Sequence, residues 1–441
     1  MKNYLFLVLT ILCCCVTVNS QSINTKKLDD YFTLIADNNR AIGTIVVSQN
    51  GKQLYDRQFG KQGNLSGKEI SGKTKYQIGS VTKMLTATMI FQLVDQKKLS
   101  LDEKLSSYFP EVPNAKSITM SHLLSHTSGL GDFVTKEDSL VYWLRKPVTE
   151  AEIFSEIKRQ GSLFEPGTQT EYSNTGYYLL TRILEKKYKK SYKTIFNDNI
   201  VKPLQLKNTR SIDKNDKGQD IAASYAFSDK WTPIEDFYFP NVIGVGDVVS
   251  TPEDMNTFLV ALFSHKLISN ESLEKMKPAE NEGFGKGLMK LPFYSHPFYG
   301  HLGDTMGSHT MSLYNPVDGL TFTVMLTGME LDRNDYLIAI LSIMYDMDYT
   351  LPDFNRYDAG ALQLSSFEGV YAGTDFPLKV KIFVNDNVLN AQATGQQAFP
   401  LEAIGKDKFR FIQAGVEMEF KNAEKTMNLT QGGKTYVLKR E

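Results

Sequence analysis

Strand patterns at both ends of a long helical stretch restrict the fold more than any other feature of this chain. Residues Ala41 to Phe59 predict a β-hairpin with Asn50-Gly51 as its tight turn. Two further strands are predicted at Ser308 to Tyr314 and at Leu320 to Leu326. Because these strands flank the helices instead of alternating with them, we expect an α+β domain whose terminal strands join in one antiparallel sheet.

The middle of the chain repeats apolar residues at helical spacing. After Ser80 the repeat comprises Met84, Leu85, Met89, Ile90, Leu93 and Val94. Further helices are predicted at Thr119 to Ser125, Tyr177 to Lys187 and Pro252 to Phe263. Thr251 is expected to cap the last of these, because it stands before a proline that suits the first helical position.

The character of the chain changes after Pro352. From residue 365 to 441, short β-rich runs alternate with turn signals such as Asn385-Asp386-Asn387 and Gly432-Gly433. We expect residues 353–441 to form a small antiparallel barrel of lipocalin-like type, or a sandwich. No helix is expected in 365–441, and no nucleophile is paired there with a base.

Charge and motif content exclude several classes of function. The chain has 49 Lys and Arg against 50 Asp and Glu, so no excess of one sign favours a nucleic acid or a charged membrane as partner. There is no dinucleotide-binding glycine motif, no Walker loop, and no metal-ligand spacing. We therefore expect no metal and no organic cofactor.

The first twenty residues predict an export signal. Lys2 is followed by an apolar run from Leu5 to Val18, too short to span a bilayer, and small residues precede Gln21. Cleavage after Ser20 would remove all three cysteines, excluding disulfides and thiol catalysis. A buried N-terminal helix and a lipoprotein signal are the alternatives; bulky residues before the first cysteine argue against the second. We expect a periplasmic or secreted protein, without a transmembrane anchor after cleavage.

Ser80 and Lys83 form the first candidate for chemistry. A serine at the start of a helix and a lysine three residues later share one helical face. The helix N-terminus offers backbone N–H groups, and a lysine withdrawn from water could accept the serine proton. The alternative is an N-cap serine at an ordinary surface helix, and this short motif cannot decide alone.

Two later motifs supply polar groups that fit the same chemistry. In Tyr172-Ser173-Asn174, a phenol near a lysine could relay a proton, and a carboxamide could orient the lysine and a substrate amide. In His301-Leu302-Gly303, the glycine could let a substrate backbone lie flat, while the histidine could donate a hydrogen bond to it. Taken singly, each motif is compatible with an ordinary loop or turn.

The order of these motifs resembles the penicillin-recognising serine hydrolases: class C β-lactamases, D-Ala-D-Ala carboxypeptidases and related esterases. The resemblance covers roughly residues 25 to 345. The segments that carry it are 80–83, 123–130 (Leu-Leu-Ser-His-Thr-Ser-Gly-Leu), 164–167, 172–174, 246–251 and 300–303. We expect residues 21–352 to form this hydrolase domain, and the C-terminal barrel is similar to a domain appended to some members.

The resemblance implies roles for individual residues. Ser80 would be the acylated nucleophile, Lys83 its activator, and Tyr172 the general base or proton relay. Asn174 would bind Lys83 and the substrate amide. His301 and Gly303 would line the substrate, and the backbone N–H groups of Ser80 and Asp304 would form the oxyanion hole. His126 would pack or hydrogen-bond instead of acting in catalysis.

The implied activity is acyl transfer to water on an amide or ester. Lysine often occupies the position of His301 in the family, and a mostly neutral histidine should anchor a carboxylate less strongly. The best substrate is then a D-Ala-D-Ala-type cell-wall peptide or another D-amino-acid amide, followed by an ester or a β-lactam. A penicillin-binding sensor or scaffold that hardly turns over is the alternative from another class. The oligomeric state is not readable from the sequence.

Overall fold

The computed structural model describes residues 23–60, 70–134, 146–349, 351–352, 354, 361–411, 415–431 and 434–441, apart from residues 217, 219, 228–229, 236 and 280–281. The expected leader over residues 1–20 lies outside this part of the chain. Across the described ranges, none of the helices combines the length and the apolar character needed to cross a bilayer.

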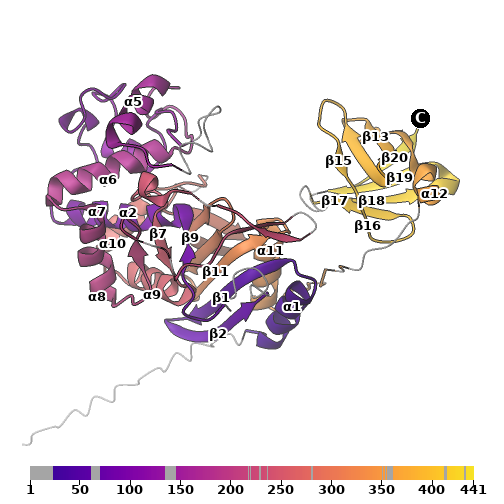
Figure 1. Cartoon of the computed structure of the whole chain (residues 1–441), viewed down its shortest axis with the longest axis horizontal. Coiled ribbons are helices and arrows are strands. Elements are labelled where there is room, and N and C mark those ends of the chain that lie inside the picture. The colour runs from indigo at the N-terminus through magenta and orange to yellow at the C-terminus, as the bar shows by residue number, and fades with distance from the viewer. Residues whose placement is uncertain are drawn as a thin grey trace, which may run out of the picture.

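A six-stranded antiparallel sheet forms the centre of the larger part of the molecule (Figure 1). Its strands are, in spatial order, β2 (Lys52–Phe59), β1 (Ala41–Gln49), β11 (Leu320–Met329), β10 (His309–Asn315), β9 (His296–Asp304) and β8 (Met289–Phe293). β1 pairs with β11 from Ala41 opposite Met329 to Gln49 opposite Leu320. The predicted α+β fold, with strands from both ends of the domain in one sheet, is confirmed.

The two faces of this sheet differ in chemistry because side chains alternate along each strand. On β11, Phe322 and Val324 face an apolar cluster with helices α1 (Thr25–Asp37) and α11 (Arg333–Met344). Thr323, between them, lies on the opposite face of the sheet. Its hydroxyl donates a hydrogen bond to Asn256 of α9 (Pro252–Phe263). Helices thus cover both faces of the sheet.

A helical region packs beside the sheet and contains the largest apolar cluster. Its central helix is α2 (Thr82–Asp95), which is buried along nearly its whole length and follows a 3₁₀ turn at Gly79–Val81. Around it lie α3 (Met120–Leu124), α5 (Glu150–Gln160), α6 (Asn174–Tyr188), α7 (Tyr192–Phe196) and α10 (Asn270–Met276). The helix predicted at 252–263 is observed as α9 with the same first and last residues, and Thr251 caps it as expected.

The C-terminal segment forms a nearly closed barrel of nine strands. These are β12 (Gly369–Ala372), β13 (Val380–Asn385), β14 (Val388–Ala393), β15 (Phe399–Pro400), β16 (Glu402–Ala403), β17 (Lys408–Phe411), β18 (Val416–Lys421), β19 (Thr426–Gln431) and β20 (Lys434–Arg440). The predicted barrel is confirmed. The expected absence of any helix is wrong for two short 3₁₀ turns, at Ser365–Phe367 and Asn422–Glu424.

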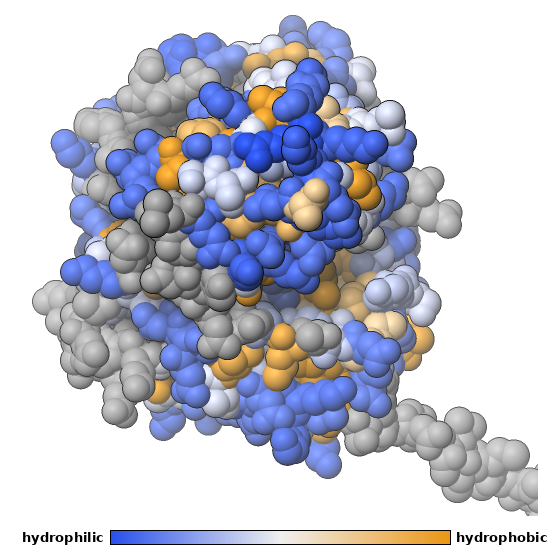
Figure 2. All heavy atoms as spheres, turned by 90° about the vertical axis from the view of Figure 1, so that its right-hand side faces the viewer, coloured by the Kyte–Doolittle hydropathy of each residue, from blue (hydrophilic) through white to orange (hydrophobic). Residues whose placement is uncertain are grey.

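Side chains fill the inside of the barrel. Phe367, on the first of these turns, packs against Phe409 and Phe420 at ring-centroid distances of 5.2 and 4.7 Å. All three rings are at most 2% exposed. Seen from the barrel side, the surface is mainly hydrophilic, with hydrophobic residues in small separate groups (Figure 2). The barrel therefore has an apolar core like that of any small domain.

Candidate active site

Ser80 lies on the turn that leads into α2, and Lys83 stands one helical turn further on. The Lys83 Nζ donates a hydrogen bond to the Ser80 Oγ at 2.9 Å and a second to the Val245 carbonyl oxygen at 3.2 Å. The turn depends on Gly79, whose φ of +51° is in the left-handed region that favours glycine. The structure thus brings the first two candidate residues into direct contact.

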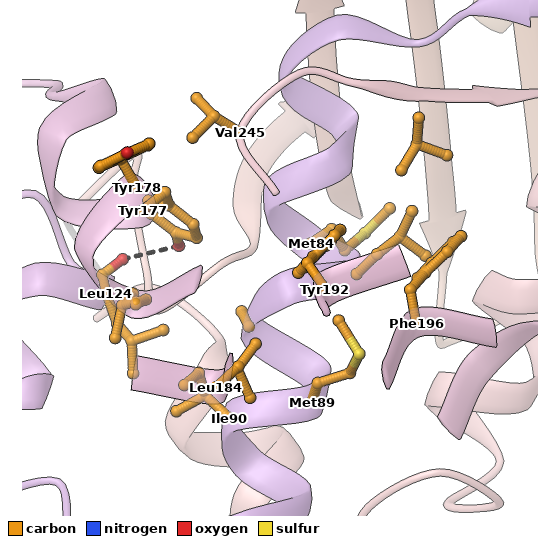
Figure 3. Packing of buried hydrophobic residues seen from close by; sticks show 14 of the residues in the cluster. Met84, Met89, Ile90, Leu124, Tyr177, Tyr178, Leu184, Tyr192, Phe196 and Val245 are labelled. Carbon is orange, nitrogen blue, oxygen red and sulfur yellow. Dashed lines mark hydrogen bonds between the residues drawn. The ribbon is translucent and has the colours of Figure 1, made fainter. Parts of the chain in front are cut away.

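The Lys83 ammonium is removed from water on all sides. Its side chain is fully buried, and it lies 4.9 Å from the centre of the Tyr172 ring and 5.8 Å from that of Tyr177. Tyr177 is fixed beside α2 by a hydrogen bond from its hydroxyl to the Leu124 carbonyl oxygen (Figure 3). Burial lowers the pKa of Lys83 from 10.5 to about 7, although the charge of Asp132 opposes this shift. A substantial fraction of Lys83 is therefore neutral near pH 7.

Tyr172 closes the other side of the lysine. The side chain is half-buried, and its buried hydroxyl makes no hydrogen bond of 3.5 Å or less within the described residues. Burial raises the pKa of Tyr172 above its ordinary value, with a partial offset from the Ser80 hydroxyl. The phenol is consequently protonated at neutral pH, so of the two expected roles this environment favours the proton relay over the general base.

Asn174 does not contact Lys83, contrary to expectation. Its backbone N–H and its Nδ2 both donate to the Asp132 Oδ2, at 3.2 and 2.8 Å. The lysine takes the Val245 carbonyl instead, because Asn174 begins α6 and its amide turns toward the buried carboxylate. Burial raises the pKa of Asp132, although the N–H donors and Lys83 oppose this.

Asp132 is a residue that the sequence reasoning missed. It follows the 123–130 segment by two positions, and nothing in its local pattern distinguishes it from a surface turn. Only its burial, its capture of Asn174 and its electrostatic effect on Lys83 mark it as part of the site. Any buried carboxylate in this position tunes the protonation of a neighbouring lysine.

His301 lies on β9, with its ring centre 6.5 Å from that of Tyr172. Its Nδ1 lies 2.5 Å from the Leu302 carbonyl oxygen, so the nitrogen must carry the proton and donate it. Burial, reinforced by the charge of Lys83, lowers the pKa of His301 to about 4. The ring is neutral at physiological pH, and its Nε2 is then an acceptor. The expected role as a donor to a substrate does not fit this tautomer.

Gly303 lies two residues after His301 and takes part in packing within the protein. A Cβ at this position would lie 2.0 Å from the Ile78 carbonyl oxygen and 3.0 Å from the Val81 nitrogen. The glycine therefore lets β9 approach the Ser80 turn, and its expected role beside a substrate backbone stays a prediction.

Asp304 ends β9 beside the same turn. A Cβ on Gly79 would lie 2.9 Å from the Asp304 backbone nitrogen, which places this peptide next to Ser80. The carboxylate contacts two side chains, the His309 ring at Nδ1 (2.7 Å) and the Arg333 guanidinium. Although burial raises the pKa of Asp304, these partners hold it below its ordinary value. Across the described residues, no group of three or more His, Cys, Asp or Glu side chains is arranged to hold a metal ion.

The fold is of the β-lactamase/transpeptidase-like type, with an antiparallel sheet beside a helical region. At the start of the central helix, a serine is hydrogen-bonded to a buried lysine, as in a serine hydrolase site. A sequence model of the beta-lactamase family matches residues 28–343. The chain belongs to the beta-lactamase family, and is a serine hydrolase of that family.

Individual relatives agree with this assignment. The chain is 26% identical to the teichoic acid D-alanine hydrolase of Staphylococcus aureus over 255 residues, 57% of this chain and 60% of that protein. D-amino acid amidase from Ochrobactrum anthropi SV3 superposes with a TM-score of 0.65 at 25% identity, covering 73% of this chain and 99% of the amidase. The octameric penicillin-binding protein homologue from Pyrococcus abyssi shares the fold over 95% of this chain and all of its own, with a TM-score of 0.69 at 24% identity.

Proposed function

We propose that the protein hydrolyses D-amino-acid amides or esters through an acyl-Ser80 intermediate. The observation that carries this proposal is the buried Lys83 Nζ, 2.9 Å from the Ser80 Oγ and with a pKa of about 7. A neutral lysine at this position can take the hydroxyl proton as Ser80 attacks the substrate carbonyl carbon. The backbone N–H groups of Ser80 and Asp304 would stabilise the oxyanion that results.

Departure of the leaving group, which completes the acylation of Ser80, needs a proton donor. The protonated Tyr172 would give its proton to the leaving amine or alkoxide and recover one from the Lys83 ammonium. Water would then attack the acyl-Ser80 carbonyl and lose its proton to the same relay, releasing the acid and free Ser80. Lys83 and Tyr172 thus act as one proton-transfer unit, and their losses should be non-additive.

The protonation and hydrogen bonding of His301 favour substrates that have no free carboxylate facing this ring. Its Nδ1–H is committed to Leu302, and its neutral Nε2 can only accept a hydrogen bond. An amide N–H, an ammonium or a hydroxyl suits such a nitrogen, whereas a carboxylate does not. This ranks D-amino-acid amides and D-alanyl esters above D-Ala-D-Ala peptides, and the similarity to a D-amino acid amidase and a teichoic acid D-alanine hydrolase supports that order.

A substrate screen tests the proposal. The purified protein and its Ser80→Ala variant are assayed with D-phenylalanine amide, a D-alanyl ester, a D-Ala-D-Ala peptide and a chromogenic cephalosporin. We expect turnover of the amide or the ester, complete loss in Ser80→Ala, and a fluorophosphonate adduct that maps to Ser80. Preference for the peptide or the cephalosporin would overturn the substrate assignment. A stable Ser80 adduct without turnover of any compound would instead identify a penicillin-binding sensor.

A further inference from the structure

His126 accepts hydrogen bonds from the backbone N–H groups of the two residues that flank Tyr172. The Glu171 N–H donates to the His126 carbonyl oxygen at 2.9 Å, and the Ser173 N–H donates to the His126 Nδ1 at 3.2 Å. The imidazole also stacks on the Tyr172 ring, with centroids 4.3 Å apart and planes 26° apart. One residue therefore holds the tyrosine from its ring face and from both sides of its backbone.

Tyr172 depends on such support because its hydroxyl interacts with the Ser80 hydroxyl without a hydrogen bond of 3.5 Å or less to hold it. That hydroxyl is buried and makes no hydrogen bond within the described part of the chain. The direction in which the phenol points is therefore set by the packing of its ring and by its backbone. The other aromatic neighbours, Phe284 at 5.7 Å and His301 at 6.5 Å, lie farther from the ring centre than His126 does.

We propose that His126 is a positioning residue for Tyr172, fixing the phenol beside Lys83 and Ser80 without itself exchanging protons. The inference rests on the proposed role of Tyr172 as proton relay. It gives a function to the one histidine in the 123–130 segment and explains why this residue faces the site although it has no reacting partner there.

The chemistry of the ring agrees with a purely supporting role. Because a backbone N–H can only donate, Nδ1 must be unprotonated, and the proton lies on Nε2. Burial, together with the charge of Lys83 and the neighbouring His301, keeps the pKa of His126 well below 6.5. The acceptor is thus available at every pH at which the enzyme would work.

The backbone of His126 limits which substitutions are informative. Its φ is +59°, in the left-handed region that asparagine tolerates better than most residues. His126→Asn keeps this conformation and an acceptor for the Ser173 N–H but loses the stacked ring. His126→Phe keeps a stacked ring but loses the acceptor. His122→Asn is the matched control, because the His122 Nδ1 also accepts a backbone N–H, from Thr119 at 3.4 Å, on the helix that precedes His126.

The test is a double-mutant cycle with Tyr172→Phe, which removes only the hydroxyl. Rates of Ser80 acylation by the best amide or ester substrate, kcat and KM for that substrate, and melting temperatures are measured for each protein. We expect His126→Asn and His126→Phe to lower acylation about tenfold or more with little change in KM, since small misplacements of a catalytic group are costly. His122→Asn should stay within about twofold of the parent, as expected for a site away from the chemistry.

The decisive comparison is made in the Tyr172→Phe background. If His126 acts through the tyrosine hydroxyl, His126→Asn should cause little further loss once that hydroxyl is absent. An equal loss in both backgrounds would show that His126 supports the fold or acts separately, and would overturn the inference. If Tyr172→Phe itself leaves acylation unchanged, the relay role in the proposed function fails instead, so the two failures are distinguishable.

Discussion

The protonation of Lys83 is set by two opposing environments, its burial and the charge of Asp132. Below about pH 7 the lysine is a cation and cannot accept the Ser80 proton, while above it the neutral amine can. The rate of Ser80 acylation should therefore rise about tenfold per pH unit below neutrality and level off above it. Measuring the rate of acylation by a neutral reagent between pH 5 and 9 tests this rise and its midpoint.

Asp132→Asn should move the midpoint of this rise in acylation rate to lower pH. Asp132 raises the pKa of Lys83, so removal of its charge leaves burial to lower that pKa further. The maximum rate can also fall, since Asp132 holds Asn174, but the midpoint of the profile is independent of that change. Asp56→Asn, on the exposed side of β2, is the control and should leave the midpoint in place. A shift toward higher pH in Asp132→Asn would contradict this account.

His301 leads to a different prediction for substrate binding. A histidine with its ordinary pKa would make KM for an anionic substrate rise as pH passes upward through about 6.5. Because burial lowers the pKa of His301 to about 4, the ring is neutral throughout the range from about pH 5.5 to 8. KM for a D-Ala-D-Ala peptide should stay flat there, as should KM for a neutral amide. A rise centred near pH 6.5 for the peptide alone would show that His301 is protonated when substrate binds.

At the scale of elements, the contact between β9 and the Ser80 turn decides whether the site assembles. Gly303→Ala would place a methyl group 2.0 Å from the Ile78 carbonyl oxygen, and a backbone atom cannot rotate away. β9 must then retreat from the turn, carrying the Asp304 N–H with it. We expect acylation to fall at least about tenfold and the melting temperature to drop by several degrees.

Gly283→Ala is the matched control for this substitution. A Cβ at Gly283 meets nothing within 4 Å, so the same chemical change carries no steric cost. Normal acylation in Gly303→Ala would show that the strand can shift without disturbing the oxyanion position.

Some elements were predictable from local pattern and others were not. The helix at 252–263 carries its own start signal, with Thr251 as cap and a proline at the first position. Helix α11 shows no alternation of apolar and polar residues at helical spacing, because residues 336–344 are apolar almost throughout and nearly all are buried. A helix that is covered on most sides loses the amphipathic signature from which a helix is recognised.

At the scale of the whole molecule, a chain of charges joins the barrel to the catalytic part. Arg40, which is 4% exposed, bonds to Glu330 at the end of β11 and lies 3.9 Å from Glu402 of the barrel. Arg410, also on the barrel, holds Glu402 at 3.0 Å. Phe354, from the connecting segment, lies 4.7 and 5.9 Å from the two guanidinium groups. Glu402 thus separates two arginines that would otherwise repel each other.

Glu402→Gln should loosen the barrel without changing the chemistry. Removing the carboxylate leaves Arg40 and Arg410 facing each other, which weakens the contact between the two parts. We expect a larger radius of gyration by small-angle X-ray scattering. Acylation by a small fluorophosphonate should stay within about twofold, as for other substitutions away from a site, because the proposed catalytic residues all precede residue 305.

The control for this experiment is Glu419→Gln, which breaks an exposed ion pair with Lys408 inside the barrel. It should change neither the scattering nor the acylation rate. An unchanged radius of gyration in Glu402→Gln would mean that apolar contacts, such as those of Phe354, hold the barrel by themselves.

The sequence by itself determined the features that depend on neighbours in the chain. Ser80 and Lys83 are one helical turn apart, so any helix that contains both brings them together. The strand alternation and the turn signals likewise predicted the sheet and the barrel. Only the tertiary structure decided which groups surround that pair: Asp132 instead of Lys83 as the partner of Asn174, a neutral His301, and His126 behind Tyr172. The physical reason is that hydrogen-bond choice and pKa depend on burial and on charges brought in from distant segments, and spacing along the chain carries no information about either.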